Sequence, residues 1–248
     1  MDDRPVPHLA AILLMPAVFG LAILVAPVVG SLGLVWLAEF PVVEAICILL
    51  PALVAARAAE SMRGALALRW PPARVLAGAF LFGATFWYLN AVLVAPLLAE
   101  HTSASDRALA GALADHTPLA LELLVLAVVP AICEEILVRG AIARGLAARF
   151  GPVAAVLLSS GYFALLHLSL ARALPTLVLG GFLAAIVLRT GSLVPAILIH
   201  ALNNGAALLI THPSIAQALN DARLPPELFF GAACGGTVIG LFMMLHRR

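Results

Sequence analysis

Long apolar stretches separated by short polar connections run along the whole chain of 248 residues. A helix that spans a membrane needs about 20 predominantly apolar residues, and most of the stretches are of this order. The pattern predicts an all-α fold, a polytopic membrane helix bundle with about eight transmembrane helices. Their approximate ranges are 9–38, 41–56, 75–98, 118–149, 152–170, 173–188, 192–210 and 227–245.

Two of these ranges carry helix-shaping residues. The first range is long for one span, and its prolines and glycines predict a single tilted or kinked helix. In the last range, the pairs Gly231-x-x-x-Gly235 and Gly236-x-x-x-Gly240 predict close packing against another helix.

The composition supports a membrane protein, because 63% of the residues are hydrophobic and only 11% are charged. An ordinary soluble domain has roughly 25% charged residues. This excludes a soluble α/β enzyme, a disordered chain and a nucleic-acid binder, and it makes the lipid bilayer the expected surroundings. All 14 basic residues are arginine, which excludes lysine chemistry such as a Schiff base. Cys47, Cys133 and Cys234 are far apart and predict neither a disulfide framework nor a thiolate zinc site.

The placement of arginine predicts which connections face the cytoplasm. The connections 57–74 and 139–149 are rich in arginine, Arg189 lies between the sixth and seventh stretches, and Arg247 and Arg248 end the chain. Under the positive-inside rule these segments are cytoplasmic, so both termini are expected in the cytoplasm. The first apolar run is expected to be a membrane helix and not a cleaved leader. Composition and size favour a bacterial inner membrane.

Ionisable residues inside apolar stretches are candidates for function, because each costs at least roughly 2.5–3.5 kcal/mol at the centre of a bilayer. Glu135 and Arg139 are four apart on one helix face and can pair. Glu134 is turned by about 100° and has no partner on its own helix, which suits a general base. An ordinary surface ion pair at a helix end is the alternative, but the apolar pattern resumes after Arg139. Glu44 and Glu122 lie near predicted helix ends and are expected to cap a helix or reach the interface.

Two further polar positions interrupt the later apolar stretches. His167 stands in a run with Arg172 as its one formal charge, and such a histidine is often a structural group with a satisfied hydrogen bond. His200 and Asn204 are four apart and share one helix face. Two neutral donors on one face can hold a developing oxyanion, and the alternative is hydrogen bonding between helices.

Counting along the predicted helices tests whether these groups can meet. Glu134 lies ~22 Å along its helix from the predicted break near residue 151, His167 lies a similar distance beyond that break, and His200 lies ~15 Å from Arg189. All three fall within the hydrocarbon core at overlapping depths. Polar side chains buried at one depth need one another as partners, which favours a shared site.

Three motifs stand in order on successive apolar helices: Glu134-Glu135-x-x-x-Arg139, Phe163-x-x-x-His167 and His200-x-x-Asn203-Asn204. This order resembles the CPBP intramembrane proteases, a family that includes the type II CAAX prenyl endopeptidases and the bacterial Abi-type proteins linked to bacteriocin immunity. The resemblance covers roughly residues 118–211. It divides the chain into an N-terminal part, 1–117, with about three helices, a catalytic core, 118–211, and a C-terminal part, 212–248, with the last helix.

The resemblance implies an endopeptidase that hydrolyses a peptide bond of a peptide or protein substrate at the membrane. In this family one pair of residues activates a water, a second pair stabilises the oxyanion, and a third pair orients the site. The matching positions are Glu134 and His167 for the first role, His200 and Asn204 for the second, and Glu135 and Arg139 for the third.

The metal requirement stays open between two possibilities. Glu134, His167 and His200 make a plausible zinc set, because catalytic zinc takes three protein ligands and a water. The sequence has no His-Glu-x-x-His motif, and the amide of Asn204 shares a face with His200. These two features favour a mechanism without a metal or any other cofactor.

Two other functions also remain open. A membrane transporter could use the same polar residues as a binding site, although the repeated halves typical of transporters are not visible in the sequence. A catalytically silent partner protein of the bacteriocin-immunity type would keep the fold without the reaction. The complete set of motifs favours an active enzyme.

Overall fold

The computed structural model describes residues 4–33, 35–103, 118–222 and 225–246, and every element in these ranges is a helix. Four segments, η1, η2, η4 and η5, are π-helical, and η3 is a 3₁₀-helix. In chain order the elements are α1 (His8–Ser31), α2 (Trp36–Val43), η1 (Glu44–Leu49), α3 (Leu50–Ala56), α4 (Met62–Ala65), α5 (Ala73–Leu89), η2 (Asn90–Val94), η3 (Ala95–His101), α7 (Leu119–Glu122), η4 (Leu123–Val128), α8 (Val129–Glu135), η5 (Ile136–Ala143), α9 (Arg144–Leu166), α10 (Leu170–Thr190), α11 (Val194–Thr211), α12 (Pro213–Ala222) and α13 (Pro226–Leu245).

The predicted membrane helix bundle is confirmed, whereas the count of eight spans stays a prediction. Within the described residues, five helices are long and apolar enough to cross a membrane, and Val194–Ile210 is an apolar helix of shorter length. The five are His8–Ser31, Leu37–Ala56, Ala73–His101, Leu170–Thr190 and Pro226–Leu245.

The prediction of one long first helix over 9–38 is wrong. α1 ends at Ser31, and the next helix begins at Trp36. Gly33 has φ +65°, a left-handed conformation that glycine adopts without strain and that commonly ends a helix. The second helix therefore starts at Trp36 and not near residue 41, which places Glu44 deeper inside it than expected.

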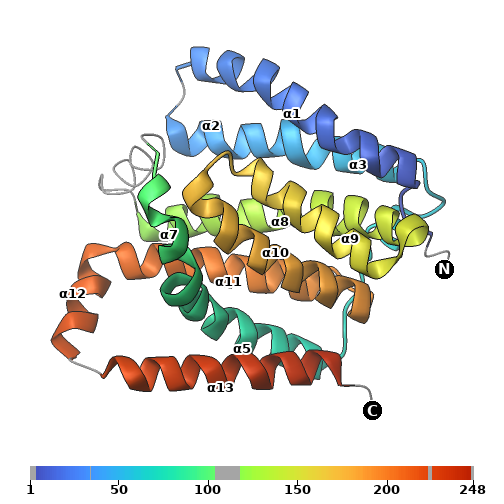
Figure 1. Ribbon diagram of the computed structural model, residues 1–248. Coiled ribbons are helices and arrows are strands. Elements are labelled where there is room, and N and C mark those ends of the chain that lie inside the picture. Colours follow the sequence, from blue (N-terminus) through green and yellow to red (C-terminus); the bar gives the residue numbers. More distant parts are fainter. Residues whose placement is uncertain (1–3, 34, 104–117, 223–224, 247–248) are drawn as a thin grey trace.

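The predicted break at Gly151-Pro152 is confirmed. Gly151 has φ 82° and ψ 167°, so the backbone leaves the helical conformation at this residue. The chain reverses there, and the second part of α9 returns along the bundle beside η5 (Figure 1). This reversal brings His167, at the end of α9, back to the level of α8.

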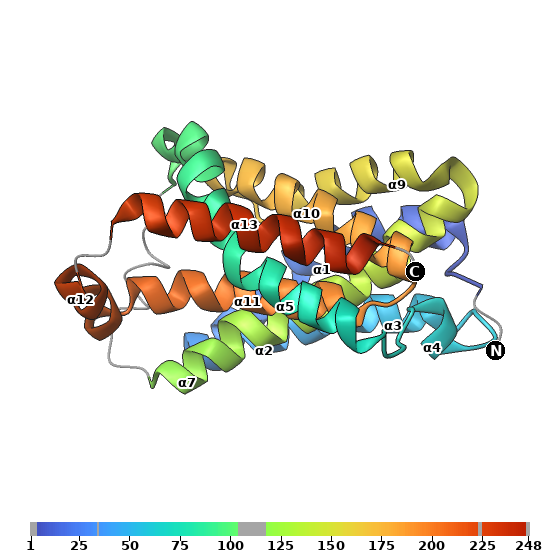
Figure 2. The same cartoon turned by 90° about the horizontal axis from the view of Figure 1, so that it is seen from below.

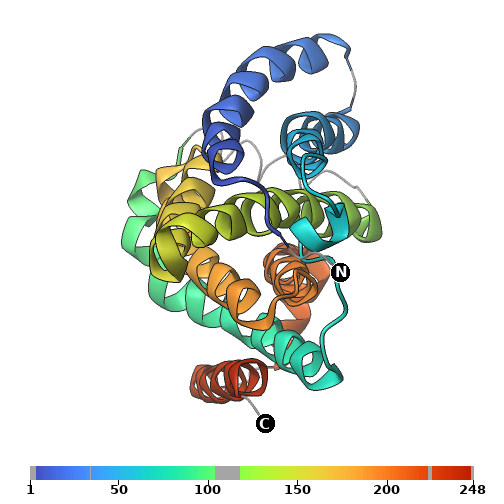
Figure 3. The same cartoon turned by 90° about the vertical axis from the view of Figure 1, so that its right-hand side faces the viewer.

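The segment formed by α8 and η5 lies at the centre of the bundle. In the end-on view this segment passes between α1 at one edge and α13 at the other (Figure 3). All eight residues of η5 are buried, under α1, α3, α9 and α10. Glu135 and Arg139 are consequently enclosed by protein rather than exposed to lipid.

The contact between α5 and α13 depends on small residues. A Cβ placed on Gly240 would lie 2.7 Å from the carbonyl oxygen of Gly78, and one on Gly236 would lie 2.5 Å from Thr85. The close-packing prediction for Gly236-x-x-x-Gly240 is therefore confirmed. It is wrong for Gly231 and Gly235, because a Cβ at either position would meet no atom within 4 Å.

The start of α1 and the end of α13 lie at the same end of the bundle (Figures 1 and 2). Arginine-rich connections gather there too: Arg144 donates to the carbonyls of Gly64 and Ala65, and Arg189 donates to the carbonyl of Leu245 at 3.5 Å. The opposite end holds α12, η3 and the turn between α9 and α10. This separation fits the alternation expected from arginine placement, and the side of the membrane that each end faces stays a prediction.

Candidate active site

A fully buried ion pair forms the base of the site. Arg139 Nη1 donates to Glu135 Oε1 at 2.7 Å, and both side chains have no exposed surface. Arg139 Nη2 donates to the carbonyl of Gly180 at 3.2 Å, and the guanidinium carbon lies 4.1 Å from the ring centroid of Phe163. The pair predicted from the four-residue spacing is therefore present, and α10 and α9 supply further partners for the cation.

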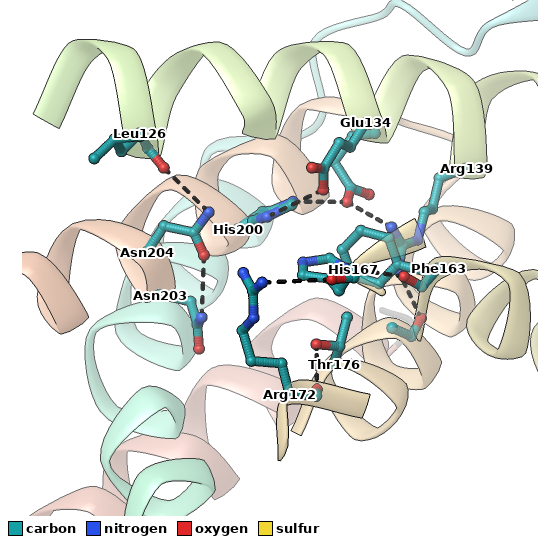
Figure 4. Close-up of polar contacts among 12 residues, drawn as sticks. Leu126, Glu134, Arg139, Phe163, His167, Arg172, Thr176, His200, Asn203 and Asn204 are labelled. Atoms are coloured by element: carbon teal, nitrogen blue, oxygen red, sulfur yellow. Dashed lines mark hydrogen bonds and ion pairs between the residues drawn. The ribbon is translucent and has the colours of Figure 1, made fainter. Parts of the chain in front are cut away.

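His200 joins this pair through a contact that the sequence did not reveal. Its Nδ1 lies 2.9 Å from Glu135 Oε1, the oxygen that also accepts from Arg139. Because an ionised carboxylate only accepts, Nδ1 is the donor in this bond. The other ring nitrogen, Nε2, lies 3.8 Å from Glu134 Oε2. Glu135 thus fixes the His200 ring so that Nε2 faces Glu134 (Figure 4).

Glu134 differs from its neighbour Glu135 in its bonding: Glu135 Oε1 accepts from Arg139 and His200, whereas no such bond is made by Glu134. Oε2 has no hydrogen-bond partner in either residue. The side chain of Glu134 is 13% exposed and lines a cavity of about 750 Å³. The contact with His200 at 3.8 Å is too long for a hydrogen bond. The expectation that Glu134 has no partner on its own helix agrees with this arrangement.

His167 lines the same cavity from the end of α9. Its Nδ1 lies 3.0 Å from the carbonyl oxygen of Phe163, and since a carbonyl only accepts, Nδ1 carries the proton. Nε2 is then the basic nitrogen. The Phe163 ring contacts the His167 and His200 rings edge-to-face, with centroids 5.1 and 5.5 Å apart. One aromatic residue therefore positions both imidazoles and the Arg139 guanidinium.

Asn203 and Asn204 also line the cavity, from α11. Asn204 Nδ2 donates to the carbonyl of Leu126 at 3.5 Å, and Asn203 Nδ2 donates to Asn204 Oδ1 at 3.3 Å. The predicted residues thus meet in one place, with the two amides, Glu134 and His167 lining the cavity and His200 lying behind Glu134. The bond to Leu126 also agrees with the alternative of hydrogen bonding between helices.

The cavity contains polar residues that sequence reasoning missed. Glu44 was expected at a helix end, but it is 8% exposed and lines the cavity, and Glu122, given the same role, is 5% exposed. The expectation for Glu44 is wrong, whereas Glu122 lies in the first turn of its helix, as expected. Asn90 and Arg172 also line the cavity. Arg172 Nη2 donates to the carbonyl of His167 at 3.4 Å.

The requirement for zinc stays a prediction. Within the described ranges, no group of three or more His, Cys, Asp or Glu side chains is arranged to hold a metal ion. His200 Nδ1 is bound to Glu135, and its Nε2 lies 3.8 Å from Glu134.

A bundle of apolar helices that encloses a carboxylate, imidazoles and carboxamides around one cavity defines a membrane protein with an internal polar site. Residues 116–206, less than half of the chain, match the family model described as Type II CAAX prenyl endopeptidase Rce1-like. This family consists of proteases, so the expected resemblance and the expected enzyme class are confirmed. The match includes the three motifs and leaves α1 to α5 outside. No curated protein and no solved structure matches the chain significantly.

Proposed function

We propose that the protein is an intramembrane endopeptidase in which Glu134 and His167 activate a water molecule. The observation that carries this proposal is that both side chains line one cavity inside the helix bundle, with Glu134 Oε2 unpaired. A general base must reach its water directly, and neither residue is blocked by another partner at its basic atom. The family match favours a protease over a transporter.

The proposed reaction begins when Glu134 takes a proton from water and the oxygen attacks the carbonyl carbon of the peptide. The carbonyl π bond breaks and its electron pair goes to the oxygen, which Asn204 stabilises by donating from Nδ2 and His200, protonated on both ring nitrogens, by donating from Nε2. The intermediate then collapses, the C–N bond breaks, and Glu134 passes its proton to the leaving amine. Because His200 Nδ1 is committed to Glu135, only its Nε2 is left to act at the reacting centre.

The proposed location is a bacterial inner membrane with both termini in the cytoplasm. The supporting observation is that the arginine-rich connections and the ends of the described chain gather at one end of the bundle. A reporter fused after Arg248 is expected to be active in the cytoplasm, and a reporter that is active on the other side contradicts the proposed topology. A second predicted reporter position, near Asp106, lies outside the described residues.

The test of the function compares membrane peptides from cells that produce the wild type or Glu134→Ala. The proposal expects at least one cleavage that disappears in Glu134→Ala and in His167→Ala. Glu39→Gln, a substitution of a carboxylate outside the cavity, serves as the matched control and is expected to retain the cleavage. If no cleavage depends on Glu134, the catalytically silent partner protein is the better interpretation.

A further inference from the structure

Two polar residues of the cavity wall lie outside residues 116–206, the segment that matches the family model. Glu44 stands at the start of η1, and Asn90 stands at the start of η2. They are 8% and 5% exposed, so both are more than nine-tenths buried. Both line the cavity that also contains Glu134 and His167.

Side-chain oxygens on this wall of the cavity lack hydrogen-bond donors. Asn90 Nδ2 donates to the carbonyl of Pro175 at 3.1 Å, which fixes the amide and leaves Oδ1 without a partner. Glu44 Oε2 also has no partner, and the same holds for Glu134 Oε2. Glu135 Oε2 and Arg139 Nε have no partner either, but these two residues do not line the cavity. A buried polar atom without a hydrogen bond is costly, so three such oxygens from three helices around one cavity indicate a bound group.

The chemistry of the three oxygens limits what that group is. Carboxylate and amide oxygens accept hydrogen bonds, so the group must donate several. The formally charged residues around the cavity are Glu44, Glu134 and Arg172, which leaves a net negative charge. A cation bound next to Glu44 therefore neutralises the excess charge.

We propose that Glu44 and Asn90 form a subsite for an ammonium or guanidinium group of the substrate, a lysine or arginine side chain close to the scissile bond. The position next to the scissile bond rests on the proposed function of Glu134. Phe40 and Trp87 also line the cavity. Aromatic rings pack against the aliphatic stem of such a side chain and attract its charge.

The first test measures peptide selectivity with the full chain in detergent. Matched peptides carry lysine, arginine or the uncharged norleucine at each of the three positions on either side of the bond. At one of these positions the wild type is expected to favour the basic peptide by at least about tenfold in kcat/KM. Glu44→Gln should reduce this ratio to about threefold or less, whereas Glu39→Gln should keep it. A wild type that prefers norleucine at every position contradicts the subsite.

The second test measures binding without catalysis. Butylammonium chloride is expected to raise the melting temperature of the wild type, while 1-butanol, of the same length and uncharged, should not at matched ionic strength. The stabilisation should be lost in Glu44→Gln and reduced in Asn90→Ala, which covers the case that one variant folds poorly. Equal effects of the amine and the alcohol, or equal effects on wild type and both variants, overturn the proposal.

The two tests separate this proposal from the proposed protease function. If no peptide is cleaved by any variant but butylammonium binding depends on Glu44, the subsite stands and the peptidase reaction is wrong. If peptides are cleaved in a Glu134-dependent manner without any basic preference, the reaction stands and the subsite is wrong.

Discussion

Two groups of buried polar residues near Glu134 differ in how their charges are paired. On one side, Glu135, Arg139 and His200 bind one another in a network that is at most 2% exposed, although Glu135 Oε2 and Arg139 Nε have no partner. On the other side, Glu44 and Asn90 each keep an oxygen without a partner. Glu134 lies between the two sides. The difference indicates that the paired side maintains the structure, while the unpaired side and Glu134 are available to a ligand.

The largest effect is expected from Glu134→Gln. We expect turnover to fall by about 100- to 10,000-fold, because the amide keeps the shape but cannot accept the proton. The melting temperature should stay close to that of the wild type, since Glu134 Oε2 has no hydrogen bond to lose. Melting curves in detergent beside a cleavage assay measure both effects. A variant that melts far earlier, or that still cleaves, contradicts the assignment of Glu134.

Glu135→Gln should act mainly on stability, with a cost of roughly 3–5 kcal/mol. The substitution removes the charge that compensates Arg139 and orients His200, so two buried groups lose their charged acceptor together. The expected result is a lower melting temperature together with lost activity. If Glu135→Gln is stable but inactive while Glu134→Gln melts early, the roles of the two carboxylates are reversed.

Removing both members of the ion pair should cost less than the sum of the single changes. Arg139→Met alone is expected to resemble Glu135→Gln, because each leaves one member of the pair without its partner. The double variant Glu135→Gln/Arg139→Met has no buried charge left uncompensated. A double-mutant cycle of unfolding free energies should give a coupling of about 0.5–3 kcal/mol. A coupling near zero would mean that the pair contributes nothing as a pair.

Phe163→Leu should have an intermediate effect on the paired side. It removes the ring that lies 4.1 Å from the Arg139 guanidinium and contacts both imidazoles, at a cost of about 1–2 kcal/mol. Phe163→Tyr keeps the ring and serves as the comparison in the same melting experiment. Equal stability of the leucine variant and the wild type would show that the ring only fills space.

The smallest effect on stability is expected from Glu44→Gln, which should change the unfolding free energy by less than about 1 kcal/mol. Glu44 Oε2 has no hydrogen bond in the folded protein, so its replacement removes no bond at that atom. Denaturant or thermal unfolding in detergent checks this. A loss as large as that of Glu135→Gln would place Glu44 in the structural network and end the contrast between the two sides.

The sequence predicted the elements that depend on local spacing. The Glu135–Arg139 pair follows from helical geometry, and the reversal at Gly151 follows from a glycine followed by a proline. The convergence of Glu134 and His167 followed from counting the same distance on both sides of that reversal. Each of these inferences needed only one helix or one turn.

The sequence could not predict contacts that depend on how separate helices lie. The bond between His200 and Glu135 joins α11 to α8, and no periodicity reports it. Glu44 was misplaced because the second helix was expected to begin near residue 41, whereas it begins at Trp36 and carries Glu44 inward. Asn90 carries no formal charge, so it did not stand out from the apolar run around it. The positions of Glu44 and Asn90 in the cavity wall were therefore recognised only from the structure.

The number of residues in the π-helical segment η5 determines how the residues of the site are oriented. Its hydrogen bonds join residues five apart, so each turn holds more residues than an α-helical turn. Deleting one residue between Gly140 and Ala143 would allow α-helical spacing and turn the preceding helix by about 100° relative to α9. The ion pair would survive, because both its members precede the deletion, but the carboxylates would no longer face the imidazoles. In this segment a gap in a sequence alignment between relatives would signal a rearranged site, not a shortened loop.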